Sequence, residues 1–520
     1  MQILIRRFGR LLELSDGYKL PLNPEIAALL TPDMVYTYRE LMRGHRDVDP
    51  IDGNRSSVRC TPKRMYDFDD YGRLICGLGY LPRISRTLQT AGHSASYDDV
   101  TPESPRPGCY IPDWDNVHRY IQFRPRQEEC LQAMVRHEFG GVIKATMGFG
   151  KSELIAAFGL LYPRARIDIV VEGLELVNSL QTRLTRYLPN IGRVGGGRPT
   201  WSRVTVISAD SLSHSDGKAD FLLGDEVHKL MAPEASQEIG ARYMFSRNFG
   251  LSGTPQGRFD GADAKMEALF GPVIFELSYS EGIELGLVVP IFVRWVPVNM
   301  DDNPVHNKTG VPRKRWGIWR NETRNMIIAD TAREFPDRQA LILVETIEHA
   351  VFLGSYLPEF SLCYGKMDES DLDFYKRNGR VPQDYQPVTP ETRERMRKEF
   401  EAGTLRKVIA TDVWSTGVDF PHLSVLLRGD ERDGEIQSSQ GPARPSRLQD
   451  GKEYAIVIDF VDNFDTKLKA KARSRYRRYK SLGWEQDWPE GRRQISEGTL
   501  PAAGSRARPR PRRQDASEPA

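Results

Sequence analysis

Short runs of aliphatic and β-branched residues alternate with helical patterns from Val142 onward, and this alternation constrains the fold most. The earlier runs lie at residues 141–144, 167–171, 204–207, 221–223 and 248–251, and the later ones at 340–344, 407–410, 423–427 and 455–460. Strands separated by helices predict a parallel sheet that is covered on both faces. The sequence therefore predicts an α/β protein with two such domains in tandem.

Changes in composition predict the domain boundaries. A Pro-rich stretch at 101–108 separates the alternating region from a start without clear alternation, and residues 290–320, rich in Pro, Asn, Lys and Arg, read as a linker. The Arg- and Pro-rich end from Gly504 cannot build a core, so we expect it to be disordered. The predicted units are an N-terminal accessory domain (1–115), a first α/β domain (116–295), a second (296–465) and a basic C-terminal extension (466–520).

Length and composition exclude several classes of protein. A chain of 520 residues should hold more than one domain. It has no apolar run of about 18 residues, which predicts no membrane span, and no secretion signal at its start, so we expect a soluble intracellular protein in the cytoplasm or nucleoid of its cell. Its five cysteines include no Cys-x-x-Cys pair, which argues against a disulfide framework or a zinc cluster.

A glycine loop lies between the first predicted strand and a helical run. It reads Ala145-Thr146-Met147-Gly148-Phe149-Gly150-Lys151-Ser152. In a phosphate-binding loop, Thr146, Gly148 and Gly150 would wrap backbone around ATP, Lys151 would reach the β- and γ-phosphates, and Ser152 would hold Mg²⁺. The strict pattern has glycine where Ala145 stands, and a plain glycine-rich turn is the competing interpretation.

An acidic pair follows a second predicted strand. Asp225 and Glu226 end the run Phe221-Leu222-Leu223-Gly224, 74 residues after Lys151. Asp225 would bind Mg²⁺ and Glu226 would orient or deprotonate the attacking water. A solvated turn would explain such a pair alone, but its distance from the glycine loop favours an NTPase site.

In this order the motifs resemble those of superfamily 2 helicases, specifically the DExH group, over about residues 118–465. That resemblance implies two RecA-like domains and an ATPase that acts on nucleic acid. His228, Ser252 and Thr254 would couple hydrolysis to the nucleic-acid surface, and Gly417 and Asp419 would lie near the nucleotide. Arg124 and Gln127 resemble the adenine-reading segment, for which a surface helix start is the alternative. Gln181, Ser208 and Thr411 fall in segments that contact the strand in this family.

Motif VI of this family, Gln-x-x-Gly-Arg-x-x-Arg, is matched irregularly. Aligning Gln437 with its first residue puts Arg444 on the last arginine, whereas Gln440 and Gly441 occupy the usual Gly-Arg positions. Arg444 is our candidate for the arginine that stabilises charge on the γ-phosphate, with Arg447 in reserve. The missing first arginine leaves open a slower motor or a shifted alignment.

Two segments outside these motifs suggest contacts with DNA. Residues 71–84 are similar to the region ahead of the motor in UvsW-like phage helicases and XPB-type repair helicases, although a packing role is the alternative. Residues 467–480 hold many basic residues and no acid, and Lys467, Lys469, Arg473 and Arg477 could neutralise phosphates while Tyr476 and Tyr479 stack on bases. A solvated helical face would also explain this run.

The resemblance implies a monomeric ATP- and Mg²⁺-dependent DNA helicase or translocase, acting on single-stranded, forked or branched DNA in replication, recombination or repair, with a 3′ to 5′ direction. An RNA helicase with the same motor is one alternative. A nucleic-acid-binding scaffold that has lost hydrolysis through its altered motif VI is another. A restriction-type subunit is less favoured, because no nuclease module is evident in the rest of the chain.

Overall fold

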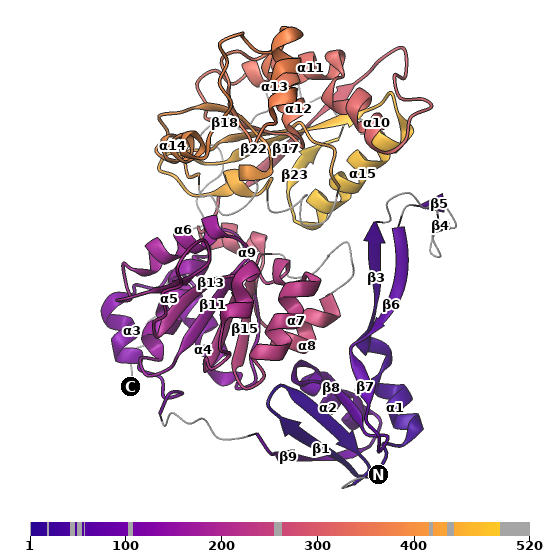
Figure 1. Cartoon of the computed structure of the whole chain (residues 1–520), viewed down its shortest axis with the longest axis vertical. Helices are drawn as coiled ribbons and strands as arrows, with labels where there is room; N and C mark the ends of the chain where they lie inside the picture. The colour runs from indigo at the N-terminus through magenta and orange to yellow at the C-terminus, as the bar shows by residue number, and fades with distance from the viewer. Residues whose placement is uncertain are drawn as a thin grey trace, which may run out of the picture.

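A computed structural model describes residues 2–17, 20–41, 47–48, 55–56, 58–101, 108–253, 263–414, 420–433 and 441–488. Figure 1 shows an N-terminal domain beside the first of two stacked α/β lobes. In the described part of the chain, no helix has the length and apolarity that crossing a bilayer requires. The two lobes confirm the predicted fold class of tandem RecA-like parallel-sheet domains.

The first lobe is built on a seven-stranded parallel sheet of order β12-β13-β11-β14-β15-β10-β16. Its strands are β10 (Gly141–Ala145), β11 (Ile167–Val171), β12 (Gly192–Val194), β13 (Val204–Ser208), β14 (Phe221–Asp225), β15 (Arg247–Ser252) and β16 (Val273–Leu277). The chain crosses back and forth, so the carboxyl ends of β10 and β14 lie at one edge with only β15 between them. This edge is where a doubly wound sheet binds its ligand.

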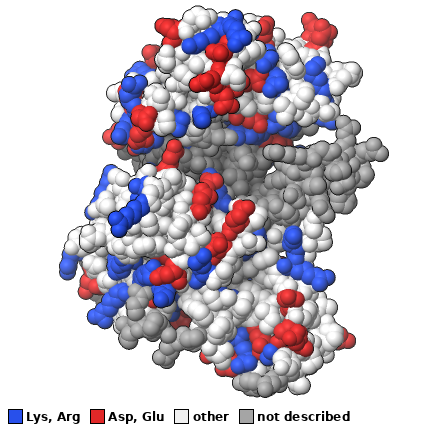
Figure 2. All heavy atoms as spheres, in the orientation of Figure 1, with Lys and Arg blue, Asp and Glu red and all other residues white. Residues whose placement is uncertain are grey.

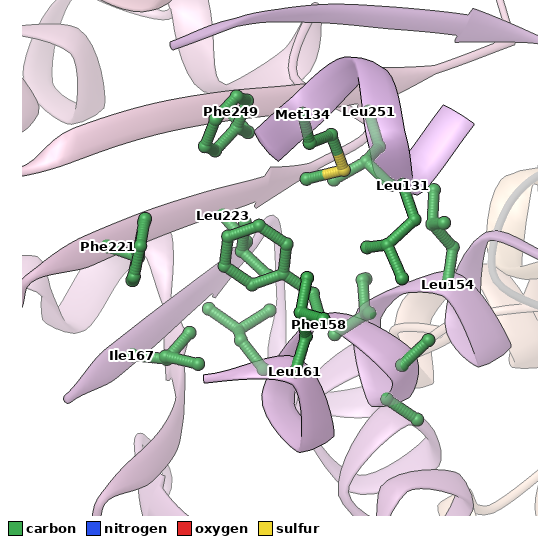
Figure 3. Packing of buried hydrophobic residues seen from close by; sticks show 14 of the residues in the cluster. Leu131, Met134, Leu154, Phe158, Leu161, Ile167, Phe221, Leu223, Phe249 and Leu251 are labelled. Carbon is green, nitrogen blue, oxygen red and sulfur yellow. The ribbon is translucent and has the colours of Figure 1, made fainter. Parts of the chain in front are cut away.

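Helices cover both faces of this sheet. They are α3 (Trp114–Tyr120), α4 (Gln127–Arg136), α5 (Lys151–Leu161), α6 (Leu174–Leu184), α7 (Pro233–Arg242), α8 (Asp263–Phe270) and α9 (Tyr279–Glu284). Figure 3 shows α4 and α5 residues packed against strand side chains, with Phe158 beside Leu223. α5 is apolar nearly all round and buried, as expected of a central helix. This packing fixes the N-terminal end of α5 against the sheet.

The second lobe repeats the design with a seven-stranded parallel sheet of order β19-β20-β18-β21-β22-β17-β23. Its strands are β17 (Ile291–Val298), β18 (Ala340–Leu343), β19 (Ser361–Cys363), β20 (Lys407–Ala410), β21 (Val425–Arg428), β22 (Ala455–Asp462) and β23 (Glu485–Asp487). Its helices are α10 (Gly310–Lys314), α11 (Glu322–Arg333), α12 (Ile347–Gly354), α13 (Glu369–Arg377), α14 (Pro390–Glu401) and α15 (Thr466–Ser481).

Two predicted boundaries differ from this arrangement. The predicted linker at 290–320 contains β17, which lies inside the second sheet between β22 and β23, so the boundary at residue 295 falls within a strand. The predicted extension from residue 466 contains α15 and β23, which both belong to the second lobe. Basic residues conceal the apolar stripe of α15, formed by Leu468, Ala472 and Tyr479, and this explains the difference.

The N-terminal domain has a mixed five-stranded sheet of order β7-β8-β2-β1-β9. Its strands are β1 (Gln2–Phe8), β2 (Leu11–Ser15), β7 (Tyr66–Phe68), β8 (Leu74–Gly77) and β9 (Ser94–Asp99), with helices α1 (Pro24–Leu30) and α2 (Leu81–Thr90). The paired strands β3 (Val35–Leu41) and β6 (Val58–Arg64) form an arm that extends from this domain alongside the first lobe (Figure 1).

The N-terminal domain docks on α8 of the first lobe. The hydroxyl of Tyr80 donates to the carbonyl of Ala264 at 2.8 Å, and Arg83 pairs with Glu267. A Cβ on Gly79 would lie 1.7 Å from the carbonyl oxygen of Glu267, so only glycine permits this approach. The 71–84 region therefore packs against the first lobe. Whether it also contacts DNA stays a prediction.

Candidate active site

The loop between β10 and α5 has the backbone of a phosphate cradle. Gly148 and Gly150 both have a φ of +86°, which glycine adopts without strain. A Cβ on Gly148 would lie 2.6 Å from the carbonyl oxygen of Leu287, and one on Gly150 would lie 2.5 Å from Nε2 of Gln127. Since α5 begins at Lys151, the first N–H groups of the helix and its positive dipole end lie at this loop.

The departure from the strict loop pattern has a local explanation. Ala145 is the last residue of β10 and is fully buried. It pairs in parallel register with Leu277, and the next amide, that of Thr146, donates to the Leu277 carbonyl at 3.2 Å. The backbone is therefore still an extended strand at Ala145, which requires no glycine.

The acidic pair ends β14 and faces the cradle. Lys151 Nζ donates to Oε1 of Glu226 at 2.8 Å. Burial and the neighbouring Glu226 raise the pKa of Asp225 to about 6. Burial also pushes the pKa of Glu226 upward, but Lys151 and His228 outweigh it and lower that pKa to about 2. The two carboxyls thus differ in proton affinity. This difference fits two roles, with Asp225 as a metal ligand and Glu226 as a permanently ionised partner of Lys151.

Glu226 also has an unusual backbone. Its φ of +46° lies in the left-handed region, where a residue with a Cβ is strained. Such strain persists where the surroundings over-determine the conformation, and it gathers at functional sites. The turn at Glu226 aims its carboxylate at Lys151 on one side and at Ser252 on the other, with Ser252 Oγ donating to Oε2 at 3.3 Å.

A buried relay leaves the acidic pair through β15. Nδ1 of His228 lies 2.7 Å from Oγ of Ser252 and 3.6 Å from Oε2 of Glu226. His228 and Ser252 are both fully buried. The structure thus brings together two of the three predicted coupling residues, while Thr254 lies outside the described residues.

The predicted adenine-reading pair grips the phosphate loop. Gln127 is 2% exposed. Its Nε2 donates to the carbonyls of Phe149 at 2.7 Å and Gly150 at 3.3 Å, and its Oε1 accepts from the Arg124 amide at 2.8 Å. The Arg124 guanidinium donates to the Gly148 carbonyl at 3.0 Å and lines the cavity. Gln127 therefore has a structural role in the phosphate loop, and its contact with a base stays a prediction.

A cavity of about 340 Å³ opens between the two lobes at this loop. The first lobe contributes the phosphate loop, Asp225, Glu226 and one side of α6, and the second contributes Glu401, Arg444 and Arg447. Six cationic side chains line it: Arg124, Lys151, Arg183, Arg186, Arg444 and Arg447. Such a density of positive charge in one cavity suits a triphosphate.

A short backbone contact holds the Arg444 segment at the interface. The amide of Val289 donates to the carbonyl of Ser446 at 2.7 Å, and Val288 bridges to Arg447. The Tyr279 hydroxyl donates to the Val289 carbonyl at 2.9 Å. The chain that leaves the first lobe therefore pins the turn that carries both arginines. Gly417, Asp419 and Gln437 lie outside the described residues.

Sequence reasoning missed the cavity residues of α6 and α14. Arg183 and Arg186 lie at and just beyond the end of α6, and Glu401 ends α14. Arg183 Nη1 donates to Oγ of Ser152 at 3.3 Å. The sequence feature that could have identified Arg183 is its place two residues after Gln181, which was predicted to contact the nucleic-acid strand.

The predicted nucleic-acid residues fall into buried and exposed groups. Ser208 is 1% exposed at the end of β13, and Thr411 is buried after β20, so both would need a local rearrangement to touch a strand. Gln181 is half-buried, and its Nε2 donates to the Ile191 carbonyl at 3.0 Å. Packing of the sheet edges, which sequence patterns do not reveal, places these side chains inward.

The sequence predicts that Tyr476 and Tyr479 of the basic run stack on bases. The structure contradicts this prediction for Tyr479. Tyr479 is fully buried, and its hydroxyl donates to Oδ2 of Asp459 at 2.9 Å. Tyr476 is half-buried against Trp295 and Trp488. The stacking prediction for Tyr479 is wrong because this residue belongs to the core of the second lobe.

Most of the basic side chains that were predicted to contact phosphates lie on the surface of α15. Lys467, Arg473 and Arg477 are exposed and Lys469 is half-buried. On the face in Figure 2, basic and acidic side chains are mixed over both lobes. Charge alone therefore does not mark a nucleic-acid surface on that face, and the contact of α15 with phosphates stays a prediction.

Comparisons with known proteins find similar sequences. Residues 120–257, which span most of the first lobe, match the family model of the type III restriction enzyme res subunit. The DNA 3′-5′ translocase XPB2 of Sulfurisphaera tokodaii is 22% identical over 378 residues, covering 68% of this chain and 85% of that protein.

A solved structure shares the fold of the two lobes. Saccharomyces cerevisiae Dbp5 bound to RNA and ADP BeF3 aligns with a TM-score of 0.50 at 13% identity, over 71% of this chain and 91% of that one. The crystal structure of T4 UvsW aligns over 94% of this chain and 99% of that one, with a TM-score of 0.38 and 17% identity. The two lobes and the cavity between them, together with the matches to the res subunit and to XPB2, resemble an ATP-hydrolysing motor of the superfamily 2 helicase class.

Proposed function

We propose that the chain is a DNA translocase or helicase that uses ATP hydrolysis between its lobes to move along or remodel DNA. The observation that carries this proposal is the shared cavity: Lys151 from one lobe and Arg444 and Arg447 from the other line the same space. A site built from both lobes changes when the lobes separate, so nucleotide turnover can drive relative motion. DNA is favoured over RNA because the sequence relative XPB2 is named as a DNA translocase.

The residues of the first lobe fit a magnesium nucleotide. Ser152 and Asp225 would hold Mg²⁺, since a hydroxyl and a carboxylate are oxygen ligands of the kind Mg²⁺ prefers, with phosphates and water completing its shell. Bound Mg²⁺ would neutralise charge on the phosphate oxygens. Lys151 would contact the β- and γ-phosphates, and it would exchange its contact with Glu226 for them.

Glu226 and the arginines would then act on the reacting groups. Once Lys151 turns to the phosphates, Glu226 would orient the attacking water through its carboxylate. Arg444, with Arg447 as the alternative, would stabilise charge on the γ-phosphate from the second lobe. The relay from Glu226 through Ser252 to His228 would transmit the state of the site to the carboxyl end of β15.

The test compares ATP hydrolysis by the full chain without nucleic acid and with single-stranded, duplex, forked and four-way DNA and single-stranded RNA. We expect DNA to stimulate hydrolysis, and Lys151→Ala and Arg444→Ala to abolish the stimulation. Stimulation by RNA alone would favour an RNA helicase. If the protein binds DNA but hydrolyses ATP with none of these nucleic acids, the result would favour the non-hydrolysing scaffold and contradict the proposal.

A further inference from the structure

Arg183 occupies a place in the nucleotide cavity that the proposed function does not explain. It lies in the last turn of α6, and its Nη1 donates to Oγ of Ser152 at 3.3 Å. Ser152 is the second residue of α5 and a proposed ligand of Mg²⁺. A guanidinium on a metal-binding hydroxyl is a cation in a place where another cation would bind.

The charge of Arg183 also acts on the second proposed ligand. Arg183 and Asp225 line the same cavity, together with Ser152. One guanidinium therefore lies within electrostatic reach of both Ser152 and Asp225. In water, repulsion of a divalent cation from a unit charge about 4 Å away corresponds to roughly thirtyfold in affinity, and salt screening reduces this effect.

The backbone beneath Arg183 is fixed, whereas its side chain has room to move. Val177, Leu180 and Leu184 bury one face of α6 against the sheet, and Gln181 binds the Ile191 carbonyl. The Arg183 side chain is half-buried and lines the open cavity. A rotation of this side chain alone can therefore move its guanidinium from Ser152 toward the space where phosphates would lie.

We infer that Arg183 is a cationic gate for the metal: its guanidinium holds the Ser152 hydroxyl against Mg²⁺ and must turn away before the metal binds. This inference rests on the proposed function, because it requires Ser152 and Asp225 to hold Mg²⁺. It goes beyond that function by making metal loading, rather than nucleotide affinity, the step that α6 controls.

The chain provides a matched control. Arg186 lines the same cavity and also lies on the α6 side of it. Arg186→Ala removes the same charge from the same space but leaves the contact with Ser152 intact. Arg183→Gln removes the charge of Arg183 while it keeps an N–H donor, and so separates charge from hydrogen bonding.

The experiment titrates Mg²⁺ into the full-length protein with a fluorescent ADP and records the midpoint for binding, with Mn²⁺ binding followed by electron paramagnetic resonance as a readout independent of hydrolysis. We expect Arg183→Ala and Arg183→Gln to lower the midpoint at least about fivefold. Arg186→Ala should change it less than twofold by this account, and thermal melting should confirm that each variant is folded.

An unchanged or higher Mg²⁺ midpoint in both Arg183 variants would overturn the gate, because Arg183 would then be neutral or helpful to metal binding. An equal decrease in Arg186→Ala would also overturn it, since the effect would then be general electrostatics of the cavity. A failure of the proposed function looks different: the wild-type protein would neither bind the fluorescent ADP nor hydrolyse ATP with DNA.

Discussion

Lys151 Nζ donates to Oε1 of Glu226 at 2.8 Å, which joins the phosphate loop directly to the acidic pair. The contact links the start of α5 to the end of β14, 75 residues apart in sequence. It keeps Glu226 ionised, with a pKa of about 2, and holds the strained Glu226 backbone in place. Each residue therefore positions the other before a nucleotide binds.

The first prediction concerns this pair. Lys151→Ala should abolish DNA-stimulated ATP hydrolysis, with kcat at least about 10²-fold lower, because a charged donor to the phosphates is lost. Glu226→Gln should abolish hydrolysis as well but should keep nucleotide binding, since Lys151 then lacks its carboxylate competitor. Steady-state hydrolysis together with the binding of a fluorescent ADP distinguishes the Lys151→Ala variant from the Glu226→Gln variant. Weaker nucleotide binding in Glu226→Gln than in the wild type would contradict the competition.

The second prediction separates the two arginines of the second lobe. Arg444→Ala should lower kcat about 10³-fold with little change in nucleotide affinity, since an arginine supplied across a cleft acts on the transition state. Arg447→Ala should have the smaller effect. Single-turnover hydrolysis measures both. The reverse order would move the catalytic role to Arg447 and would support a shifted alignment of motif VI.

The third prediction concerns pH. Mg²⁺ requires ionised Asp225, and the pKa of this carboxyl is raised to about 6, so the protonated form grows as the pH falls through 6. The apparent affinity for Mg²⁺ should then decrease about tenfold for each pH unit below that value. Mg²⁺ titrations of nucleotide binding between pH 5 and 8 test this at about half-unit intervals. Asp225→Asn should bind Mg²⁺ weakly at every pH, and a pH dependence that survives in this variant would have another origin.

The fourth prediction tests the relay. Ser252→Ala removes the hydroxyl between Glu226 and His228, so DNA should stimulate hydrolysis about tenfold less. Basal hydrolysis without DNA should stay within about twofold of the wild type on the same account. If basal and stimulated rates fall together, Ser252 supports the chemistry of the site rather than its coupling to DNA.

The fifth prediction uses neighbouring arginines of α15. Arg475 is buried and binds Asp459 through two contacts of 2.8 and 2.9 Å, so Arg475→Ala should destabilise the second lobe by about 3–5 kcal/mol. The exposed pair Arg473→Ala and Arg477→Ala should leave stability unchanged. The double substitution should instead weaken DNA binding, and the salt dependence of that binding should decrease by about two counterions. Urea unfolding and DNA titrations at several salt concentrations measure the two effects.

Much of the motor was predictable because its strands are continuous apolar runs. Parallel strands buried on both faces show such runs, and all nine predicted strands are present in the two sheets. Two of the strands that were not predicted have polar or interrupted sequences: β17 contains Arg294 and Pro297, and β23 is Glu485-Gln486-Asp487. Their place is decided by pairing with β22 and with each other, which depends on tertiary packing.

The site was predictable where the chemistry depends on local sequence. Gly148 and Gly150 lie on the loop after β10, Lys151 begins the helix that follows, and Asp225 ends β14, so motif spacing locates them. Arg183 was missed because only the packing of α6 against α5 brings it to Ser152. Tyr479 was misread because its aromatic and basic neighbourhood resembles a binding face, whereas its hydroxyl satisfies the buried Asp459.

The most direct measurement is a crystal structure of the full chain with a non-hydrolysable ATP analogue, Mg²⁺ and single-stranded DNA. Our account predicts the phosphates between the Gly148–Ser152 loop and the guanidinium of Arg444 or Arg447, with Lys151 withdrawn from Glu226 and Arg183 withdrawn from Ser152. A nucleotide bound elsewhere, or both second-lobe arginines turned away from the γ-phosphate, would contradict the claim that the two lobes close on one ATP.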